Sequence, residues 1–506
     1  MVKNSKKSKS SNESLLTDNR ILDKSLDNNI TLIKGIFQND DTLITRRIEN
    51  YSNSKLKGCL FFIQGMINSD YLSESIIKPF LKLNEPDSNA NFVDLLETKV
   101  IFSNAIKKTN ELDKILEAIL IGDTALLLDG YSDALVISSR DWEKRPISEP
   151  DTEKVVRGPR EGFGESLVVN LSMLRRKIQN PSLKFEFRKF GTETHTKACI
   201  CYIDGIAPKE ILDELNSRLS KIDLDSILDS QYIQEFLNDA RISPFETVGS
   251  TERPDTVAGK LLEGRIAILV DGTPFALTIP FLFIEYFQVN EDYYNNYIYM
   301  SFNRILRIIA AFLTVSVPAI YLSFVTYNQE MIPTPLLLSI YSSRESIPSP
   351  TVVECILMLL VFEILRETGT RLPSAIGQTT SIVGALVLGQ AAVDARLVSA
   401  PIVIVVALTG ITGLLNIKNS AATVLLRAIF LLSSAFLGIY GYIFTLLGLI
   451  IHLMSIKSFG VPYMLTIGSI KPEYIKDVIV RTPWWYSTVH PFFISIKHKK
   501  KRGGKN

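Results

Sequence analysis

The sequence has little excess of charge of either sign and few histidines, and both shortages exclude a class of protein. Its 55 lysines and arginines stand against 53 aspartates and glutamates, a formal net charge of +2. A nucleic-acid binder carries a basic excess on one domain, so this class is excluded. The four histidines are scattered, without an HExxH or CxxC pattern, and no glycine-rich loop ends in GK[ST]. The sequence therefore predicts neither a metal site nor a cofactor site.

Cysteine is also scarce, and its four copies form no disulfide framework. Cys199 and Cys201 lie two residues apart in an apolar run. On a strand, two such side chains share one face and could not easily bridge. We interpret these two residues, Cys59 and Cys355 as small buried apolar residues.

Charge is scarcest over 305–456, where 13 of 152 residues carry it. A long apolar third of the chain indicates a membrane domain and excludes a purely soluble enzyme. Clear spans are expected at about 305–327, 374–393, 398–415 and 428–454.

Two further apolar stretches, 331–342 and 351–365, are shorter. The first is too short to cross the hydrocarbon core alone, and it could enter and return only if protein or water covered its backbone. The N-terminus lacks the apolar segment of a signal peptide, and the tail from Lys497 is basic, so both ends are expected inside. The number of crossings is then even, four or six. The clear spans place Lys418 and Arg427 in an outside loop, against the preference of positive charge for the inside.

Residues 31–302 contain an internal duplication. The run ILIGDTALLLDGYSDALVI around Gly122 matches KLLEGRIAILVDGTPFALTI around Gly264, 142 residues later. Upstream, GCLFFIQGMI matches ACICYIDGIA at an offset of 140. Each copy predicts a helix end, a buried strand, a tight Asp-Gly turn and a return strand. Asp129-Gly130 and Asp271-Gly272 are expected at equivalent hairpin tips.

The predicted fold is thus a duplicated α/β soluble N-terminal domain of two similar subdomains, followed by an α-helical multi-pass transmembrane domain. The expected boundaries are a disordered basic and polar tail at 1–30, a first subdomain at 31–150, a second at 151–302, a transmembrane domain at 303–456 with four clear spans and up to six, and a cytoplasmic basic tail at 457–506.

Ionisable side chains gather in the ambiguous stretch 330–371. Such groups are expensive at membrane depth, so they are functional candidates by default. Glu363 and Glu367 lie one helical turn apart and Arg366 follows Glu363 by three residues, so local ion pairs are available. Alternatively, these residues form an interfacial hairpin whose charges face headgroups and water. The candidate ion-pair and gating cluster comprises Glu330, Glu363, Arg366, Glu367 and Arg371.

The expected span 374–393 has small residues every three or four positions, which make one smooth face. Such a face alone indicates tight helix packing. Glutamine and threonine on the same span favour a helix that lines a polar path, closed by an apolar collar at its centre. The candidate pore and gate residues are Gly377, Gln378, Val383, Leu386, Val387 and Gln390.

Long collinear words of the sequence, from about residue 57 to 465, resemble the A subunits of the GerA-type spore germinant receptors. The words are Thr251-Glu-Arg-Pro-Asp-Thr-Val-Ala, the run from Lys260 to Pro274, Glu330-Met-Ile-Pro-Thr-Pro335, Glu363-Ile-Leu-Arg-Glu367, Arg371-Leu-Pro, Gly377-Gln, Ile382-Val-Gly-Ala-Leu386, Gly389-Gln-Ala-Ala-Val393 and Phe459-Gly-Val-Pro-Tyr463.

The resemblance implies a multi-pass protein of the spore inner membrane, with a cytoplasmic N-terminal domain, that is not an enzyme. Family A subunits act with a transporter-like B subunit and a lipoprotein C subunit. They are similar to a ring-forming, homo-oligomeric ion channel that opens on nutrient binding and starts germination. A secondary transporter and a non-conducting scaffold remain as alternatives. Transporters usually carry their repeat in the membrane half, whereas the repeat here lies in the soluble half.

Overall fold

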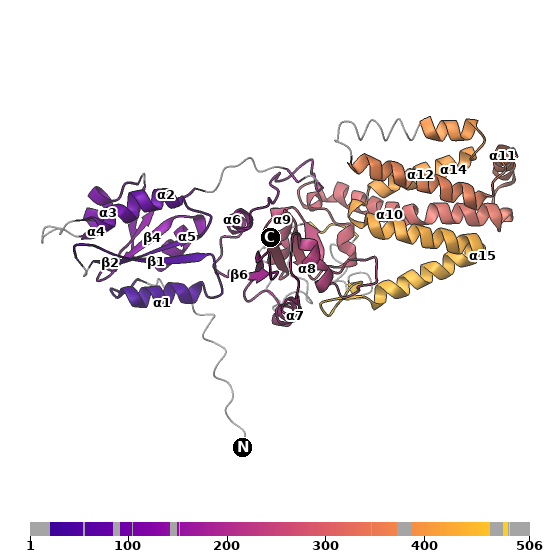
Figure 1. The fold of residues 1–506 in the computed structure, drawn as a ribbon. Coiled ribbons are helices and arrows are strands. Elements are labelled where there is room, and N and C mark those ends of the chain that lie inside the picture. Colours follow the sequence, from indigo (N-terminus) through magenta and orange to yellow (C-terminus); the bar gives the residue numbers. More distant parts are fainter. Residues whose placement is uncertain are drawn as a thin grey trace, which may run out of the picture. The chain divides into compact units, whose positions relative to one another are not determined.

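The computed structural model describes residues 21–53, 56–83, 92–103, 105–141, 149–150, 152–345, 347–371, 387–465, 479–483 and 485. These residues form two compact units (Figure 1). The sheet unit contains the described residues up to Leu237 together with 248–280. The helical unit contains 238–247 and the described residues from Phe281 onward.

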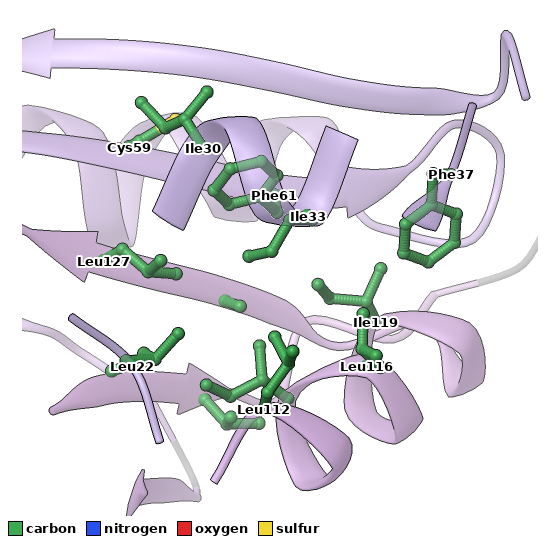
Figure 2. Close-up of a cluster of buried hydrophobic side chains, with 14 of the residues drawn as sticks. Leu22, Ile30, Ile33, Phe37, Cys59, Phe61, Leu112, Leu116, Ile119 and Leu127 are labelled. Carbon is green, nitrogen blue, oxygen red and sulfur yellow. The ribbon is translucent and has the colours of Figure 1, made fainter. Parts of the chain in front are cut away.

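The first half of the sheet unit is a five-stranded antiparallel sheet with helices on both faces. Its strand order is β1-β2-β4-β5-β3. Helices α1 and α5 cover one face, where Ile33, Phe61 and Ile119 are fully buried (Figure 2), and short helical turns cover the other. The elements are α1 (Leu26–Ile36), β1 (Leu43–Glu49), β2 (Lys57–Ile63), α2 (Ser69–Tyr71), η1 (Leu72–Ile77), α3 (Lys78–Leu81), α4 (Phe92–Leu95), η2 (Leu96–Val100), β3 (Ile106–Thr109), α5 (Leu112–Ile121), β4 (Thr124–Leu128) and β5 (Ala134–Ile137).

The second half repeats this topology, because its strand order is β6-β7-β9-β10-β8. Each strand takes the place of its counterpart in the first sheet, so the predicted duplication is confirmed. The elements are α6 (Leu167–Lys177), β6 (Leu183–Phe190), β7 (Thr196–Ile203), α7 (Lys209–Leu219), α8 (Ser230–Leu237), β8 (Gly249–Thr251), α9 (Pro254–Leu262), β9 (Ile266–Val270) and β10 (Ala276–Ile279).

The Asp-Gly turns do more than reverse the chain. Gly130 and Gly272 adopt φ values of 83° and 88°, as a tight turn of this kind requires. In addition, Asp129 Oδ1 accepts the backbone N–H of Leu26 (3.2 Å), and Asp271 Oδ1 accepts that of Leu167 (2.9 Å). Each aspartate therefore satisfies a free N–H in the first turn of a helix more than 100 residues earlier in the chain. The duplication extends to this contact, which the sequence pattern did not reveal.

A buried ion pair joins the two halves of the sheet unit. Arg175 Nη2 lies 2.5 Å from Asp40 Oδ2, and both side chains are fully buried. Nearby, Lys184 Nζ donates to the carbonyl oxygen of Ile36 (3.0 Å). Burial lowers the pKa of Lys184, a shift that the Asp40 charge partly offsets.

The helical unit is built on α10 and α15, which have mean hydropathies of 2.2 and 2.0 over their most apolar windows. Among the described residues, these two are long and apolar enough to cross a membrane, and α14 is a shorter apolar helix. The elements are η3 (Phe283–Tyr286), η4 (Asn290–Tyr293), α10 (Tyr297–Thr326), η5 (Gln329–Met331), α11 (Thr334–Arg344), α12 (Thr351–Arg371), α14 (Ala400–Leu414), η6 (Ile417–Asn419), α15 (Ser420–Ser455), β11 (Lys457–Ser458) and β12 (Val461–Pro462).

The last of these long helices, α15, is a helical hairpin. Gly438 interrupts it with φ 60° and ψ −140°, and Figure 1 shows two limbs that meet at a sharp angle. Thr445 Oγ1 donates to Ser433 Oγ (2.8 Å), although the two residues are 12 apart in the chain. In a straight helix they would be about 18 Å apart. The expectation of a single span over 428–454 is therefore wrong, and the legs are 420–437 and 439–455.

The helical unit has two ends, which we call the base and the apex. At the base, Asn416 Nδ2 donates to the carbonyl oxygen of Arg307 (2.9 Å), which places the α14–α15 connection beside the first half of α10. At the apex, the Tyr327 hydroxyl donates to the carbonyl oxygen of Ala435 (2.8 Å). Along α10, Arg307 and Tyr327 are separated by about 30 Å, the thickness of a hydrocarbon core. Lys418, two residues after Asn416, belongs to the base.

Candidate functional site: charged and polar side chains of the helical unit

An ion pair joins α12 to the first leg of α15. Glu363 on α12 accepts from Arg427 on α15 through Oε1, and its Oε2 lies 2.7 Å from Arg366 Nη2. The Arg427 side chain is 6% exposed and that of Glu363 is 21% exposed. One carboxylate thus neutralises part of the charge of two guanidinium groups in an apolar setting. Removing either buried partner leaves the other charge uncompensated, which is strongly destabilising.

The position of Arg427 corrects an expectation. It lies in the first leg of α15, about 10 Å from the start of that helix, and not in an outside loop. The spacing of Glu363 and Arg366 indicated a pair within α12, whereas the partner on the neighbouring helix was missed. An arginine flanked on both sides by apolar residues, as Arg427 is, was the available signal.

The other members of the predicted cluster are Glu330, on a different element, and Glu367 and Arg371, further along α12. Glu330 is an exposed residue of η5, which follows α10 at the apex. Glu367 is exposed on α12, and Arg371 is the last residue of that helix. The structure thus brings together Glu363 and Arg366 but separates Glu330 from them.

Of the candidate pore residues, Gly377, Gln378, Val383 and Leu386 lie outside the described residues. Val387 and Gln390 belong to a helical segment at 387–394. Val387 is 57% exposed, and Gln390 Nε2 donates to Asp394 Oδ1 (3.0 Å) at an exposed position. Neither residue faces the core of its own chain.

Hydroxyl groups pair between helices in the interior of the helical unit. Thr314 Oγ1 on α10 lies 2.9 Å from Thr412 Oγ1 on α14. Tyr442 Oη, in the second leg of α15, donates to Ser316 Oγ (2.9 Å). Such bonds hold helices together in an apolar medium, where packing of small residues supplies much of the remaining attraction.

A buried carboxylate anchors α10 at the base. Asp292 Oδ2 accepts from Arg304 Nε (3.1 Å) and from Arg307 Nη2 (2.6 Å). The side chains of Asp292 and Arg304 are fully buried.

The base also contains an aromatic cluster that connects the end of α15 to the segment 238–247. Tyr463 packs against Phe283 with ring centroids 6.0 Å apart, and its hydroxyl donates to the carbonyl oxygen of Glu246 (2.8 Å). The backbone N–H of Phe459 donates to Asp239 Oδ2 (2.8 Å). Burial raises the pKa of Tyr286, beside this cluster, to about 12, so its hydroxyl stays neutral, and it accepts the backbone N–H of Glu246 (3.0 Å). In sequence, 238–247 connects α8 to β8, so this cluster bonds the end of α15 to a segment that continues into the sheet unit.

Comparison with known proteins places these features in a family context. The family described as Bacillus/Clostridium GerA spore germination protein matches residues 31–493. Spore germination protein KA of Bacillus subtilis (strain 168) is 41% identical over 485 residues, covering 96% of this chain and 89% of that protein. Spore germination protein B1 of the same organism is 35% identical, covering 93% of this chain and 97% of that protein.

Two further similarities come from an uncharacterised protein and from a crystal structure. The uncharacterised membrane protein YfkQ of Bacillus subtilis (strain 168) is 39% identical, covering 92% of this chain and 94% of that protein. The N-terminal domain of the A subunit of the Bacillus megaterium spore germinant receptor GerK3 is 32% identical. The structural match covers 53% of this chain and 98% of that domain, with a TM-score of 0.41.

Proposed function

The chain belongs to the GerA family of spore germination proteins, and we propose that it is the subunit of a germinant receptor that conducts ions when nutrient is sensed. The family supports a receptor subunit in spore germination, a group that is not a known enzyme family. The proposed ion conduction rests on the charged and hydroxyl side chains that apolar helices enclose, above all Glu363 and Arg427. Such groups are costly to bury among apolar helices in a membrane, so their presence there points to a function.

We propose that the conducting path lies between copies of the chain. Val387 is 57% exposed and Gln390 is exposed, so a path that they line would have to run along the outside of one subunit. Several copies arranged in a ring would enclose it. This argument supports a homo-oligomer with the candidate gate residues Gly377, Gln378, Val383, Leu386, Val387 and Gln390 on its inner face.

We propose six membrane crossings with the base on the cytoplasmic side of the spore inner membrane. Three crossings are α10, α12 and α14, and two are the legs of α15. The starts of α12 and α14 lie side by side, since the backbone N–H of Ser399 donates to Glu354. The sixth crossing is the expected span 374–393, most of which lies outside the described residues. Lys418 and Arg307 then lie inside, as basic residues prefer.

The proposed partners are a transporter-like B subunit, which binds the nutrient, and a lipoprotein C subunit. In this arrangement, the present chain contributes the ion path and the cytoplasmic sheet unit. The aromatic cluster at the base is the connection through which a movement of the second leg of α15 reaches the segment 238–247.

Flux from liposomes tests the proposal. The purified full-length protein, reconstituted with and without its partner subunits, is expected to release K⁺ from loaded vesicles, and nutrient should increase release when the partners are present. Absence of release under both conditions would favour the non-conducting scaffold. Counter-transport of a labelled solute would favour a secondary transporter. A detergent-solubilised particle with the mass of one chain would rule out the ring.

A further inference from the structure

The apex side of the helical unit contains a second buried carboxylate, Glu354, near the start of α12. Glu354 is 1% exposed. Its Oε2 accepts the backbone N–H of Ser399 (2.9 Å), just before α14. Its Oε1 has no hydrogen-bond partner among the described residues. A buried carboxylate oxygen without a donor has lost its solvation without replacement, which is costly.

Three other polar atoms near Glu354 are in the same condition. Within the part of the chain that the structure describes, no hydrogen bond of good geometry reaches Ser399 Oγ, Tyr321 Oη or Arg344 Nε. Ser399 is 1% exposed, and the Tyr321 hydroxyl lies near enough to Ser399 for a weak contact between the two hydroxyl groups and interacts with the charges of Glu354 and Arg344. The four atoms converge from α10, α11, α12 and the residue that precedes α14.

Arg344 forms a long ion pair with Glu354. Its Nε lies 3.8 Å from Glu354 Oε1, which is too long for a hydrogen bond. Its side chain is 22% exposed, whereas that of Glu354 is fully buried. The guanidinium therefore lies at the edge of the cluster, where it balances the charge of Glu354 without donating a hydrogen bond to it.

The chemistry of the open atoms selects a ligand. A carboxylate and two hydroxyl groups are hard oxygen donors, which suit alkali and alkaline-earth cations and not the softer transition metals. No group of three or more His, Cys, Asp or Glu side chains that could hold a metal ion occurs among the described residues. One carboxylate balances one positive charge, which favours a monovalent ion over Ca²⁺ or Mg²⁺.

We propose that Glu354, Ser399 and Tyr321 form a binding site for a monovalent metal cation, and that Arg344 competes with this cation for Glu354. The site is separate from the ion pair of Glu363 and goes beyond the proposed conduction, since a cation can bind here whether or not the protein conducts. An ordered water would satisfy the same atoms, and a purely structural latch between α11 and α12 would need no ligand.

Thermal unfolding of the full-length protein in detergent tests the site. The unfolding midpoint is measured in NaCl, KCl and choline chloride at equal ionic strength. We expect a higher midpoint in Na⁺ or K⁺ than in choline, because a ligand that binds only the folded state stabilises it. Glu354→Gln should abolish the difference. Arg344→Gln should lower the cation concentration for half of the effect by about tenfold, since a competing charge is removed.

One control and one further variant make the outcome interpretable. Glu345→Gln makes the same change of charge at the exposed neighbouring position and should leave the cation dependence unaltered. Tyr321→Phe removes one ligand and keeps the bond from Glu354 to Ser399, so it should weaken binding severalfold even if Glu354→Gln does not fold. Equal midpoints in the three salts for both the natural protein and Arg344→Gln would overturn the proposal and leave a water or a latch. Ion flux from liposomes is measured separately from the unfolding midpoint. A protein that fails to conduct can therefore still show the dependence of the midpoint on the cation, and the two failures are distinguishable.

Discussion

The ion pair between Glu363 and Arg427 is expected to contribute to stability because its arginine is buried. Since the Arg427 side chain is 6% exposed, Glu363→Gln leaves a nearly buried guanidinium with no full counter-charge. Such a loss costs about 3–5 kcal/mol in a dry interior, and the partial exposure of Glu363 places the expected cost at the lower end. We expect a lower unfolding midpoint in detergent and less receptor in spores.

The double variant Glu363→Gln with Arg427→Gln separates the pair from other effects. It removes both charges and should recover a large part of the lost stability, because no uncompensated charge remains. Arg366→Gln is the matched control, since the Arg366 side chain is 37% exposed and an exposed ion pair contributes about 1 kcal/mol or less. If the double variant is as unstable as the sum of the two single variants, the pair has no coupling and the interpretation fails.

Single residues also show where sequence reasoning reached its limit. The cysteines are all buried, as their apolar surroundings predicted, and Arg366 lies beside Glu363 as the helical spacing allows. Arg427, Asp292 and Glu354 gain their partners from other elements, 64, 12 or 15, and 45 residues away in the chain. A spacing rule within one helix cannot find such partners, because they depend on how the helices pack.

At the scale of elements, the hairpin of α15 depends on one glycine. Gly438 has φ 60° and ψ −140°, a conformation that side chains with a Cβ rarely adopt. A Cβ added there would lie 2.9 Å from the Cβ of Tyr327. Gly438→Ala should therefore cost about 1–3 kcal/mol in backbone strain, with a further cost from the contact. We expect a lower unfolding midpoint and loss of the apex bond between Tyr327 and Ala435.

Gly448→Ala is the matched control in the second leg of the same hairpin. An added Cβ at Gly448 meets no atom within 4 Å, and alanine is the better helix former. This variant should be neutral or slightly more stable, measured by the same thermal unfolding. A Gly438→Ala protein that is as stable as Gly448→Ala would show that the chain reversal tolerates an ordinary residue.

Sequence patterns predicted the sheets far better than this hairpin, for a physical reason. The sequence contains two copies of an apolar strand followed by an Asp-Gly turn, and comparison of the two copies identified the strands and the positions of the turns. The run 420–455 is apolar almost throughout, and a glycine in such a run indicates close packing as readily as a reversal. The backbone of Gly438 and the contact between Ser433 and Thr445 distinguish one long span from two shorter legs.

For the whole molecule, the proposed topology predicts which side of the membrane each connection faces. A cysteine placed at Lys418, at the base, should react with an impermeant maleimide only in inverted vesicles. A cysteine placed at the exposed Glu330, at the apex, should react only in right-side-out vesicles.

The four natural cysteines are buried, and burial raises the pKa of Cys59 to about 11. At pH 7, which lies well below this pKa, its thiol stays protonated and unreactive. Labelling of both positions from one side would contradict six crossings.

In the proposed ring, a change at Val387 acts between subunits and not within one chain. Val387 is 57% exposed on its own subunit, so truncating it removes few contacts within the chain and should leave the amount of protein nearly unchanged. If copies of this residue form an apolar constriction, Val387→Ala widens it and admits water, because apolar gates close by dewetting. We expect ion release from spores without nutrient, at a normal protein level on an immunoblot. Val353→Ala, at a residue that is 49% exposed on α12, is the matched control and should cause no leak. Leakage from both variants, or less protein without leakage from Val387→Ala, would exclude Val387 from the gate.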